Sequence, residues 1–373
     1  MPSSLGRPAH RFQPTRSANP DRIVHFKEDK MITYFHPAEL GHHVRTRLYG
    51  GSLIEAVEIP DRLKALHDAA KLCTDEFVQP APADMGVIAE VHDAGYLDFL
   101  KTGYAAWKER FPDSLELRPS LHPNAYMRRL PDDLLGRAGY FIADGASVLL
   151  EDTWEATIAS AASALAATQK VLDGEVAAYA LCRPPGHHAY RDMACGYCFL
   201  NNGALAATLA RRAAGRVTIL DVDVHHGNGT QTLFYDRADV QTISVHADPR
   251  TTYPFYAGYA DERGEGAGEG CNLNLPVDVG SGDAVYLAAV KAGIDAAEKF
   301  SPDVVVLALG LDASEADPFA CTKVTSEGFA HMGEMLGAMK KPTAIIQEGG
   351  YPSPILGDNL IRFMNGFRAA SGA

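Results

Sequence analysis

The sequence predicts an α/β fold in which a central, mostly parallel sheet is covered by helices on both faces. One observation is that apolar, β-branched runs alternate with segments of helical periodicity along the 373 residues, a pattern typical of parallel sheets. A second is that several of these runs end in carboxylate, imidazole or phenol side chains, and open α/β sheets bind ligands beyond the carboxyl ends of their strands. We find no internal repeat or linker, and we expect one catalytic domain over residues 29–373 with its active site at that edge.

The N-terminal segment before this domain has a different composition. Residues 1–28 contain Pro, Ser, Arg and His without an apolar core, so we expect a flexible arm and no secretory signal. Residues 31–35 then predict the first strand. Residues 36–52 are polar and irregular and predict a long loop. Its tandem His42 and His43 have no acidic or cysteine partner at ligand spacing, so they are expected at the surface.

Two helices and a second loop are expected next. Residues 60–72 have helical periodicity with Pro60 in the first turn, where proline is favoured. A further helix is expected from residue 91 to residue 108, and residues 111–133, rich in Pro, Arg and Asp, predict another long loop. An Ala-rich apolar segment with helical spacing predicts a helix at 154–172.

The second half of the chain carries most of the predicted sheet. Continuous apolar runs predict buried strands at 177–182, 215–220, 239–246, 303–310 and 342–347. The segments between them have helical spacing and predict helices at 202–214, 284–299 and 324–339. The Gly- and Glu-rich residues 259–270 are expected to form a loop.

The composition restricts the classes of function. With 46% hydrophobic and 22% charged residues, the chain has ordinary globular composition. The formal net charge of −13 disfavours nucleic acid as a partner, because binding to phosphates needs a basic face. It is compatible with a cationic small substrate. The sequence has no run of about 18 apolar residues, so we expect no membrane span.

The six cysteines are scattered, and two of them form a C-x-x-C motif at Cys195 and Cys198. Such a motif can serve redox chemistry or zinc binding. Because there is no second C-x-x-C, the sequence favours reduced thiols packed near a site. The protein is therefore expected in the cytoplasm.

The strand predicted at 215–220 runs into a cluster of potential metal ligands. Asp223 and His225 are two residues apart, so an extended backbone directs both side chains to one side, which Asp221 shares. A carboxylate and an imidazole aimed at one point suit a divalent metal of the zinc class. Asp312, at the end of the strand 303–310, supplies a third ligand, which leaves an open position for catalysis. Taken alone, the cluster could be a polar surface turn and Asp312 a helix N-cap.

Other strand ends carry candidates for acid–base chemistry. His187 and His188 follow a Pro-Pro-Gly turn and could act as acid and base, since imidazole titrates near neutrality. Each needs a partner that fixes its tautomer, and Asp221 and Asn228 are the candidates. After Gly349-Gly350, which allows close backbone approach to a ligand, the phenol of Tyr351 could donate to a developing oxyanion. A single buried histidine or a packed tyrosine would be the structural alternative.

Five motifs together resemble the histone deacetylase superfamily of zinc amidohydrolases, which has an arginase-like α/β fold. They are Arg-Pro-Pro-Gly-His-His-Ala at 183–189, Gly-Tyr-Cys-Phe-Leu-Asn-Asn at 196–202, Asp-Val-Asp-Val-His-His-Gly-Asn-Gly-Thr at 221–230, Leu-Gly-Leu-Asp at 309–312 and Glu-Gly-Gly-Tyr at 348–351. The similarity extends from about residue 31 to the C-terminus. Within the superfamily, residues 45–51 and the segments around 139 and 153 look most like bacterial acetylpolyamine amidohydrolases.

The resemblance implies roles for individual residues. Asp223, His225 and Asp312 would bind Zn²⁺, although Fe²⁺ tolerates the same ligands. His188 would be the general base, and His187, held by Asp221, its electrostatic or acid partner. Tyr351 would stabilise the oxyanion. Substrate-binding positions would be Gly196, Tyr197, Tyr253, Phe319 and Gly350.

The resemblance also implies a second ion and a partner. The family often binds a structural K⁺, here matched by the side chains of Asp221 and Ser244 and the carbonyl groups of Asp223, His225 and Val245. In the acetylpolyamine branch the loop matching residues 36–52 builds a homodimer that narrows the entrance, so a homodimer is expected.

The expected activity is removal of acetyl or related short acyl groups from small acylated amines, of acetylpolyamine or acyl-lysine type. Arg47 and Leu135 depart from the branch, because they stand where its members carry acidic residues that would face a substrate ammonium. Deacylation of a non-polyamine amide is therefore an alternative. A dinuclear manganese ureohydrolase would need more carboxylates, and a non-catalytic binding protein would not need the intact histidine pair and Tyr351.

Overall fold

The computed structural model describes residues 30–127 and 129–373. Their main feature is an eight-stranded sheet with the order β4-β1-β5-β10-β9-β6-β7-β8, in which every neighbouring pair is parallel. The strands are β1 (Ile32–Tyr34), β4 (Glu76–Val78), β5 (Ala177–Ala180), β6 (Val217–Asp221), β7 (Val240–Ala247), β8 (Asn272–Val277), β9 (Val304–Leu309) and β10 (Thr343–Gln347). The predicted parallel α/β fold with a central sheet is confirmed.

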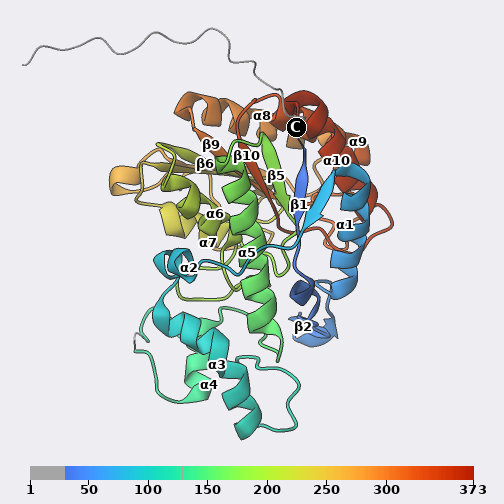
Figure 1. Cartoon of the computed structure of the whole chain (residues 1–373). Helices are drawn as coiled ribbons and strands as arrows, with labels where there is room; N and C mark the ends of the chain where they lie inside the picture. Colours follow the sequence, from blue (N-terminus) through green and yellow to red (C-terminus); the bar gives the residue numbers. More distant parts are fainter. Residues whose placement is uncertain (1–29, 128) are drawn as a thin grey trace, which may run out of the picture.

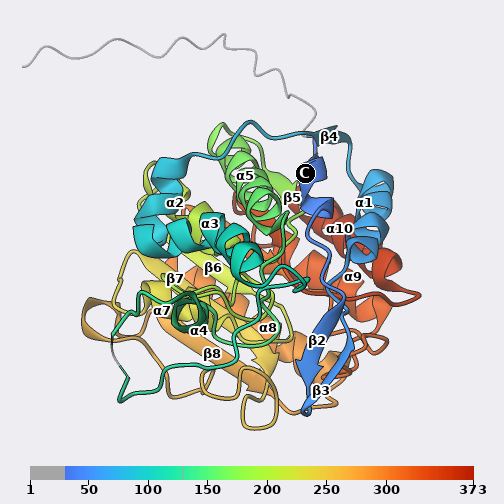
Figure 2. The same ribbon diagram turned by 90° about the horizontal axis from the view of Figure 1, so that it is seen from below.

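Helices cover both faces of the sheet (Figures 1 and 2). They are α1 (Pro60–Cys73), α2 (Met85–Val91), α3 (Ala94–Arg110), α4 (Leu134–Phe141), α5 (Thr153–Leu172), α6 (Asn202–Arg211), α7 (Asn228–Phe234), α8 (Asp283–Phe300), α9 (Ser326–Gly337) and α10 (Leu356–Ser371). The α5 and α6 helices pack on one face, and α1, α8, α9 and α10 lie on the other. Each face thus has its own apolar core, and the strands between them are buried on both sides.

The central strands are formed by the runs that the sequence singled out. In β6, β9 and β10 every residue is buried, and β-branched residues such as Val217, Val304 and Ile345 fit a pleated surface between two helix layers. Because β6 pairs with β9 and β9 with β10, the residues that follow these three strands come out at one edge. This edge lies at the lower end of the molecule in Figure 1.

Residues 36–52 are not the irregular loop that the sequence predicted. They contain a 3₁₀ helix, Pro37–Leu40, and the first strand of an antiparallel hairpin formed by β2 (Thr46–Tyr49) and β3 (Ser52–Glu55). The paired Gly50 and Gly51 both have positive φ, as a two-residue hairpin turn requires. The expected surface position is correct for His43 but wrong for His42, which is buried and lies 3.0 Å from the Thr153 hydroxyl.

Other elements were missed or differ in extent. The helix expected at 91–108 is α3, which begins three residues later, and the short helix α2 that precedes it was not predicted. The sequence reading missed β4 and β8, the two edge strands, because their residues are only partly buried and less apolar. It also missed α4, α7 and α10, which begin directly after polar loops.

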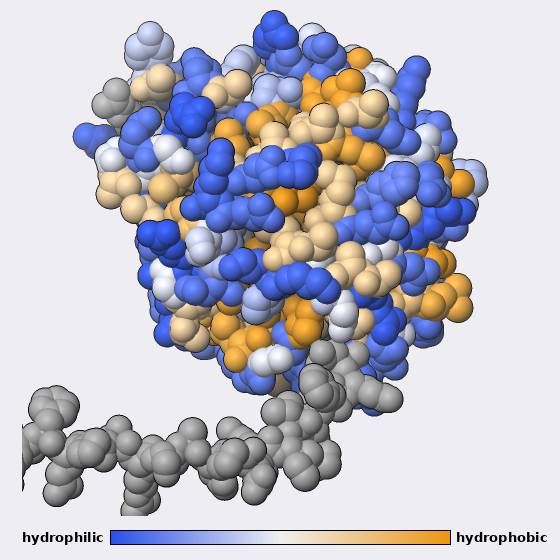
Figure 3. All heavy atoms as spheres, turned by 90° about the horizontal axis from the view of Figure 1, so that it is seen from above, coloured by the Kyte–Doolittle hydropathy of each residue, from blue (hydrophilic) through white to orange (hydrophobic). Residues whose placement is uncertain are grey.

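The outer surface mixes residue types. No helix in the described part of the chain is long and apolar enough to cross a membrane. Hydrophobic and hydrophilic side chains are interspersed on the face shown in Figure 3. Large exposed hydrophobic side chains occur in the β2–β3 hairpin, where Leu48, Tyr49 and Leu53 are all more than half exposed. The hairpin lies on the side of the molecule seen in Figure 2.

Candidate metal centre and active site

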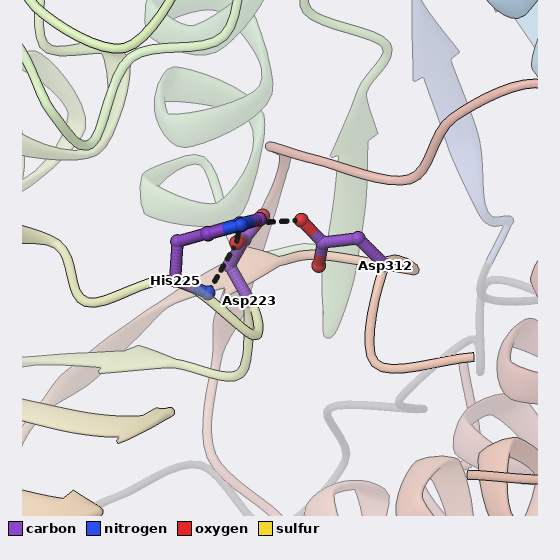
Figure 4. A group of neighbouring side chains, drawn as sticks. All are labelled: Asp223, His225 and Asp312. Atoms are coloured by element: carbon purple, nitrogen blue, oxygen red, sulfur yellow. Dashed lines mark hydrogen bonds and ion pairs between the residues drawn. The ribbon is translucent and has the colours of Figure 1, made fainter. Parts of the chain in front are cut away.

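Three predicted metal ligands meet beyond the ends of β6 and β9. Asp223 and His225 lie in the loop after β6, and Asp312 lies just after β9. The Nδ1 atom of His225 is 3.2 Å from the Asp223 Oδ1 atom and 3.0 Å from the Asp312 Oδ2 atom (Figure 4). One donor atom from each of the three side chains lies within 4.8 Å of the others, and all three residues are buried. This arrangement has the geometry of a metal site.

Backbone groups fix the two carboxylates. The N–H of Gly349, after β10, donates to Asp223 at 2.6 Å, and the N–H of Val224 donates to Asp312 at 3.0 Å. A side chain at position 349 would collide with both carboxylates, because a Cβ atom there would lie 2.3 Å from Asp312 and 2.4 Å from Asp223. The neighbouring strands therefore pre-organise the carboxylates before any ion binds.

The electrostatics of the three residues fit a cation. Burial would lower the pKa of His225, but the carboxylates of Asp223 and Asp312 overcome this effect and raise it well above the ordinary value. Burial, together with the charge of Asp223, raises the pKa of Asp312 to about 6. Two buried carboxylates around one imidazole thus need a positive charge, which a proton or a divalent metal ion can supply. The oxygen and nitrogen donor set suits Zn²⁺ or Fe²⁺.

The tandem histidines lie beside this group with different partners. The Nδ1 atom of His187 is 2.8 Å from the Asp221 carboxylate, and the Nδ1 atom of His188 is 2.6 Å from the Asn228 side-chain oxygen. Burial alone would lower the pKa of His187, but the charges of Asp221 and Asp223 raise it to about 10. Burial and the charge of His187 lower the pKa of His188 well below its ordinary value. The carboxylate partners thus favour the charged form of His187, whereas burial and the neighbouring charge favour the neutral form of His188.

Asn228 determines which nitrogen of His188 is free. Its oxygen accepts from His188 Nδ1–H, while its Nδ2 donates to the Tyr190 hydroxyl at 2.5 Å. Tyr190 thereby holds the amide in this orientation, and the Nε2 atom of His188 is left as the basic nitrogen. The sequence reading did not single out Tyr190, whose spacing from Asn228 gives no signal before folding.

Tyr351 follows the Gly349-Gly350 pair and lines the same cavity as His188 and His225. Its ring packs edge-on against Tyr197, with 6.0 Å between ring centres, and against Phe319 at 4.9 Å. Its N–H donates to Asp317 at 3.0 Å. Gly350 has φ 107°, a conformation that favours glycine, and this backbone turn brings Tyr351 back towards the metal ligands.

A cavity of about 710 Å³ reaches from the surface to these residues. Its lining includes the buried His188, His225 and Tyr351 as well as the exposed Leu48 and Tyr49 of the hairpin. Of the predicted substrate-binding residues, the lining includes Gly196, Tyr197, Tyr253 and Phe319. Gly350 is not part of the lining and acts on it through the position of Tyr351.

The aromatic walls contact the catalytic candidates directly. The ring centre of Tyr253 is 5.0 Å from that of His188, and the ring centre of Phe319 is 5.3 Å from that of His225. Asp144, which the sequence did not indicate, accepts hydrogen bonds from the Tyr253 hydroxyl at 2.9 Å and from the Gly196 N–H at 2.9 Å. Aromatic faces with one anchored hydroxyl form a narrow and mainly apolar passage.

The residues predicted for K⁺ lie behind the metal group. Asp221 of β6 is paired with Ser244 of β7, and both line a small space of about 10 Å³. The Asp221 carboxylate contacts His187 and the Asp223 N–H, and the Val245 carbonyl accepts from the Tyr286 hydroxyl at 3.2 Å. The side chains of Asp221 and Ser244 are thus brought together.

The two departures from the acetylpolyamine branch have different positions. Arg47 lines the cavity entrance. Leu135 lies in the first turn of α4, is partly exposed and does not line this cavity. Only Arg47 is in a position to meet a substrate there.

The cysteines of the C-x-x-C motif are free thiols, and the Sγ atom of Cys195 is 2.8 Å from the Tyr253 hydroxyl.

Comparisons with known proteins match almost the whole chain. Residues 56–366 match the family model "Histone deacetylase domain". The chain belongs to the histone deacetylase family. Within this family it is 43% identical to acetylpolyamine amidohydrolase from Burkholderia pseudomallei, over 92% of this chain and 100% of that protein. It is 40% identical to acetylpolyamine amidohydrolase 1 from Pseudomonas aeruginosa, over 88% and 96% of the two chains.

Histone deacetylase family members of known structure share the fold described above. A crystal structure of acetylpolyamine aminohydrolase from Burkholderia pseudomallei superposes with a TM-score of 0.88 at 42% identity, and the match covers 91% of this chain and 99% of that one. Family membership identifies an enzyme that acts on amides. It also indicates a metal-dependent deacetylase, in agreement with the Asp223, His225 and Asp312 group.

Proposed function

We propose that this histone deacetylase family member is a zinc-dependent amidohydrolase that removes acetyl or related short acyl groups from acylated amines. The observation that carries the proposal is the juxtaposition of three groups at the buried end of one cavity: the Asp223, His225 and Asp312 ligand set, the neutral His188 and the phenol of Tyr351. An amide carbon held among them would have a base on one side and a hydrogen-bond donor on the other.

Each residue has a distinct role in this proposal. Asp223, His225 and Asp312 would hold Zn²⁺, which when bound acidifies water and polarises an amide carbonyl. The Nε2 atom of His188 takes the proton from the attacking water, because its Nδ1–H is committed to Asn228. The Tyr351 O–H donates to the oxyanion that develops on the carbonyl oxygen.

His187 provides charge to the same reaction. Its imidazolium, held by Asp221, is adjacent to His188, with 4.0 Å between the ring centres. A fixed positive charge there stabilises negative charge that develops in the transition state, and it lowers the basicity of His188. His187 can also return a proton to the departing amine. The aromatic walls formed by Tyr197, Tyr253 and Phe319 exclude water from an acyl-amine chain.

The similarity to acetylpolyamine amidohydrolases suggests acetylated polyamines as the amine class. Acyl-lysine and non-polyamine amides are the alternatives, because Arg47 adds a positive charge to the cavity entrance. Hydrolysis of the amide depends on the buried end of the cavity, and the choice of amine depends on its entrance. The two parts of the proposal can therefore be tested separately.

The test uses purified, zinc-loaded protein and a panel of acetylputrescine, acetylspermidine, acetylcadaverine and acetyl- or trifluoroacetyl-lysine peptides. We expect release of acetate or trifluoroacetate from at least one of them. We expect Tyr351→Phe to lower kcat by about 100-fold or more while the zinc content is unchanged, since one oxyanion donor is worth that much. Asp223→Ala should abolish zinc binding as measured by elemental analysis.

Each part of the proposed function has a result that would contradict it. Full activity in Tyr351→Phe would exclude the oxyanion role, and full zinc content in Asp223→Ala would exclude the ligand assignment. Two manganese ions per active site in the native enzyme would favour the ureohydrolase alternative. Absence of hydrolysis for all of these amides, with zinc bound, would favour a binding protein.

We also propose a structural K⁺ and a cytoplasmic location. Asp221 and Ser244 line one small space, and a monovalent cation there would add positive charge beside the buried carboxylate. The elemental analysis above measures potassium in the same samples. The six free cysteines, of which five are buried, fit a reducing compartment.

A homodimer is the assembly that we propose. The β2–β3 hairpin exposes Leu48, Tyr49, Leu53 and Ile54 beside the cavity entrance. Exposed apolar side chains gathered on one hairpin are typical of an interaction surface. A second copy seated there would narrow the entrance.

A further inference from the structure

Arg47 occupies a particular position at the cavity entrance. It lies on β2, and its guanidinium stacks over two aromatic rings, with the Cζ atom 4.8 Å from the ring centre of Phe319 and 5.2 Å from that of Tyr49. Both stacking contacts fix a long side chain that would otherwise be flexible. The guanidinium is therefore held in place in the lining of the cavity.

This position is only one ring away from the reacting centre. The Phe319 ring that Arg47 stacks on also contacts His225, with 5.3 Å between ring centres, and Tyr351, at 4.9 Å. A substrate whose amide reaches the metal ligands must therefore pass Phe319 and bring the far end of its amine close to Arg47. The charge at that far end decides whether Arg47 attracts or repels the substrate.

The charge of Arg47 is not compensated within the described residues. No carboxylate forms an ion pair with it there, and its Nε atom is buried without a hydrogen-bond acceptor. Arg118, whose Nη2 donates to the Thr46 carbonyl of the same hairpin, is different, because its Nε donates to Glu116 at 2.8 Å. Unlike Arg118, Arg47 therefore has neither a carboxylate partner nor an acceptor for its Nε among the described residues.

The lining also holds one carboxylate among the described residues, that of Asp144. Its Oδ2 atom accepts hydrogen bonds from the Tyr253 hydroxyl, the Gly196 N–H and the Cys195 thiol. The negative charge of Asp144 is therefore held beside Tyr253, whereas the positive charge of Arg47 is held beside Phe319. A substrate end that passes Phe319 meets the cation.

We propose that Arg47 is a specificity-determining residue that selects acylated amines whose far end carries a carboxylate over those whose far end carries an ammonium group. The proposal rests on the proposed amide hydrolysis and names the substrate class for it. A carboxylate can accept charge-assisted hydrogen bonds from a guanidinium group such as that of Arg47. An ammonium group at the same place would be repelled at short range, where the dielectric is below that of water.

The test compares two substrates that differ little except in the charge of one end. N-acetyl-γ-aminobutyrate and N-acetylputrescine have similar length, one ending in a carboxylate and the other in an ammonium group, and N-butylacetamide is their neutral counterpart. We expect the native enzyme to prefer the carboxylate over the ammonium by about tenfold or more in kcat/KM, as one short-range charge contact predicts. Arg47→Glu should reverse this order, and Arg47→Met should bring the two values close together.

Arg45→Glu is the matched control, because it makes the same change of charge two residues away at an exposed position that does not line the cavity. It should leave the ratio between the two substrates within about twofold of the native value. If Arg47 had only a structural role, its replacement would change the hydrolysis of all three substrates equally. The ratio between the carboxylate and ammonium substrates would then stay at the native value.

The proposal is overturned if the native enzyme prefers N-acetylputrescine, or if Arg47→Glu leaves the ratio unchanged while N-butylacetamide is still hydrolysed. Failure of the proposed function has a different signature, because then none of the three amides is hydrolysed by any variant. Hydrolysis of N-butylacetamide by Arg47→Glu also shows that the variant is folded.

Discussion

Individual residues of the site depend on how their charges are balanced. Two buried carboxylates, Asp223 and Asp312, share one imidazole, and backbone N–H groups fix the remaining carboxylate oxygens. His187 and His188 are neighbours in sequence, but a carboxylate partner gives one a positive charge and an amide partner leaves the other neutral. The difference between adjacent residues of the same type comes from the single side chain that each one meets.

Gly349 packs directly against the carboxylates of the proposed metal ligands Asp223 and Asp312. We expect Gly349→Ala to weaken zinc binding by about 10- to 100-fold, the range seen when groups that support metal ligands are altered. The reason is that the new Cβ atom would lie 2.3–2.4 Å from the carboxylates of Asp312 and Asp223 and would displace both. Competition with a chromophoric chelator measures the zinc affinity.

Gly203→Ala is the control for this variant. Gly203 lies in α6, and the nearest atom to a Cβ there is the Asn201 Oδ1 at 3.7 Å, an ordinary contact. This variant should keep native zinc affinity. Native affinity in Gly349→Ala as well would show that the carboxylates can move without loss of the site.

The pairing of strands and the packing of helix ends bring the residues of the site together. The parallel pairing of β6 with β9 and of β9 with β10 delivers Asp223, Asp312 and Gly349 to one point. At the periphery, His92 ends α2, and its Nε2 atom accepts the N–H of Asn201, the N-cap of α6, at 3.0 Å. This buried histidine therefore connects three helices, because α3 begins two residues later.

His92 makes stability depend on pH. Burial lowers the pKa of His92 from its ordinary value of 6.5 to about 4, and a proton on Nε2 would displace the Asn201 N–H. Above pH 6.5 the histidine is neutral in both states and the stabilisation is complete. As the pH falls from 6.5 to 4, the unfolded chain takes up a proton that the folded protein excludes, so up to about 3 kcal/mol of stability is lost.

The measurement is urea unfolding of the native protein and of His92→Gln between pH 7 and pH 4. His92→Gln should be less stable at pH 7, and the difference between the two proteins should shrink towards pH 4. Other titrating groups contribute equally to both proteins, so the difference isolates His92. A constant difference across this range would show that His92 is not held neutral.

The whole molecule has two apolar cores on either side of one sheet and an exposed apolar hairpin beside the cavity. The cores make the framework rigid, and loops at one edge carry the site. The β2–β3 hairpin is the part of this edge that packs least against the body, since all four residues of β3 are exposed.

We expect the native protein to have the mass of a dimer by light scattering after size exclusion. Leu53→Asp, at a position that is 61% exposed on the hairpin, should shift it to a monomer, because a charge in an apolar interface loses its hydration. Leu72→Asp is the control, since Leu72 is 76% exposed on α1. A native monomer, or a dimer that survives Leu53→Asp, would contradict the proposed interface.

Much of the fold and of the site could be predicted from the sequence. The runs around β5, β6, β7, β9 and β10 are buried on both sides, so their apolar, β-branched composition is a strong local signal. Asp223 and His225 could be paired because two residues along an extended chain point the same way. Asp312 and Tyr351 could be added because all strands of a parallel sheet end at one edge.

Other features were decided only by the tertiary structure. The edge strands β4 and β8 have a weak local pattern because one side of each lacks a neighbouring strand. The orientation of Asn228 by Tyr190, the occupation of Asp144 and the stacking of Arg47 on Phe319 join residues far apart in the chain. The sequence by itself determined the sheet and the chemistry of its edge, because both follow from local periodicity and residue type. Only tertiary packing decided which partner each charged group meets, because such contacts depend on three-dimensional proximity, which local pattern does not encode.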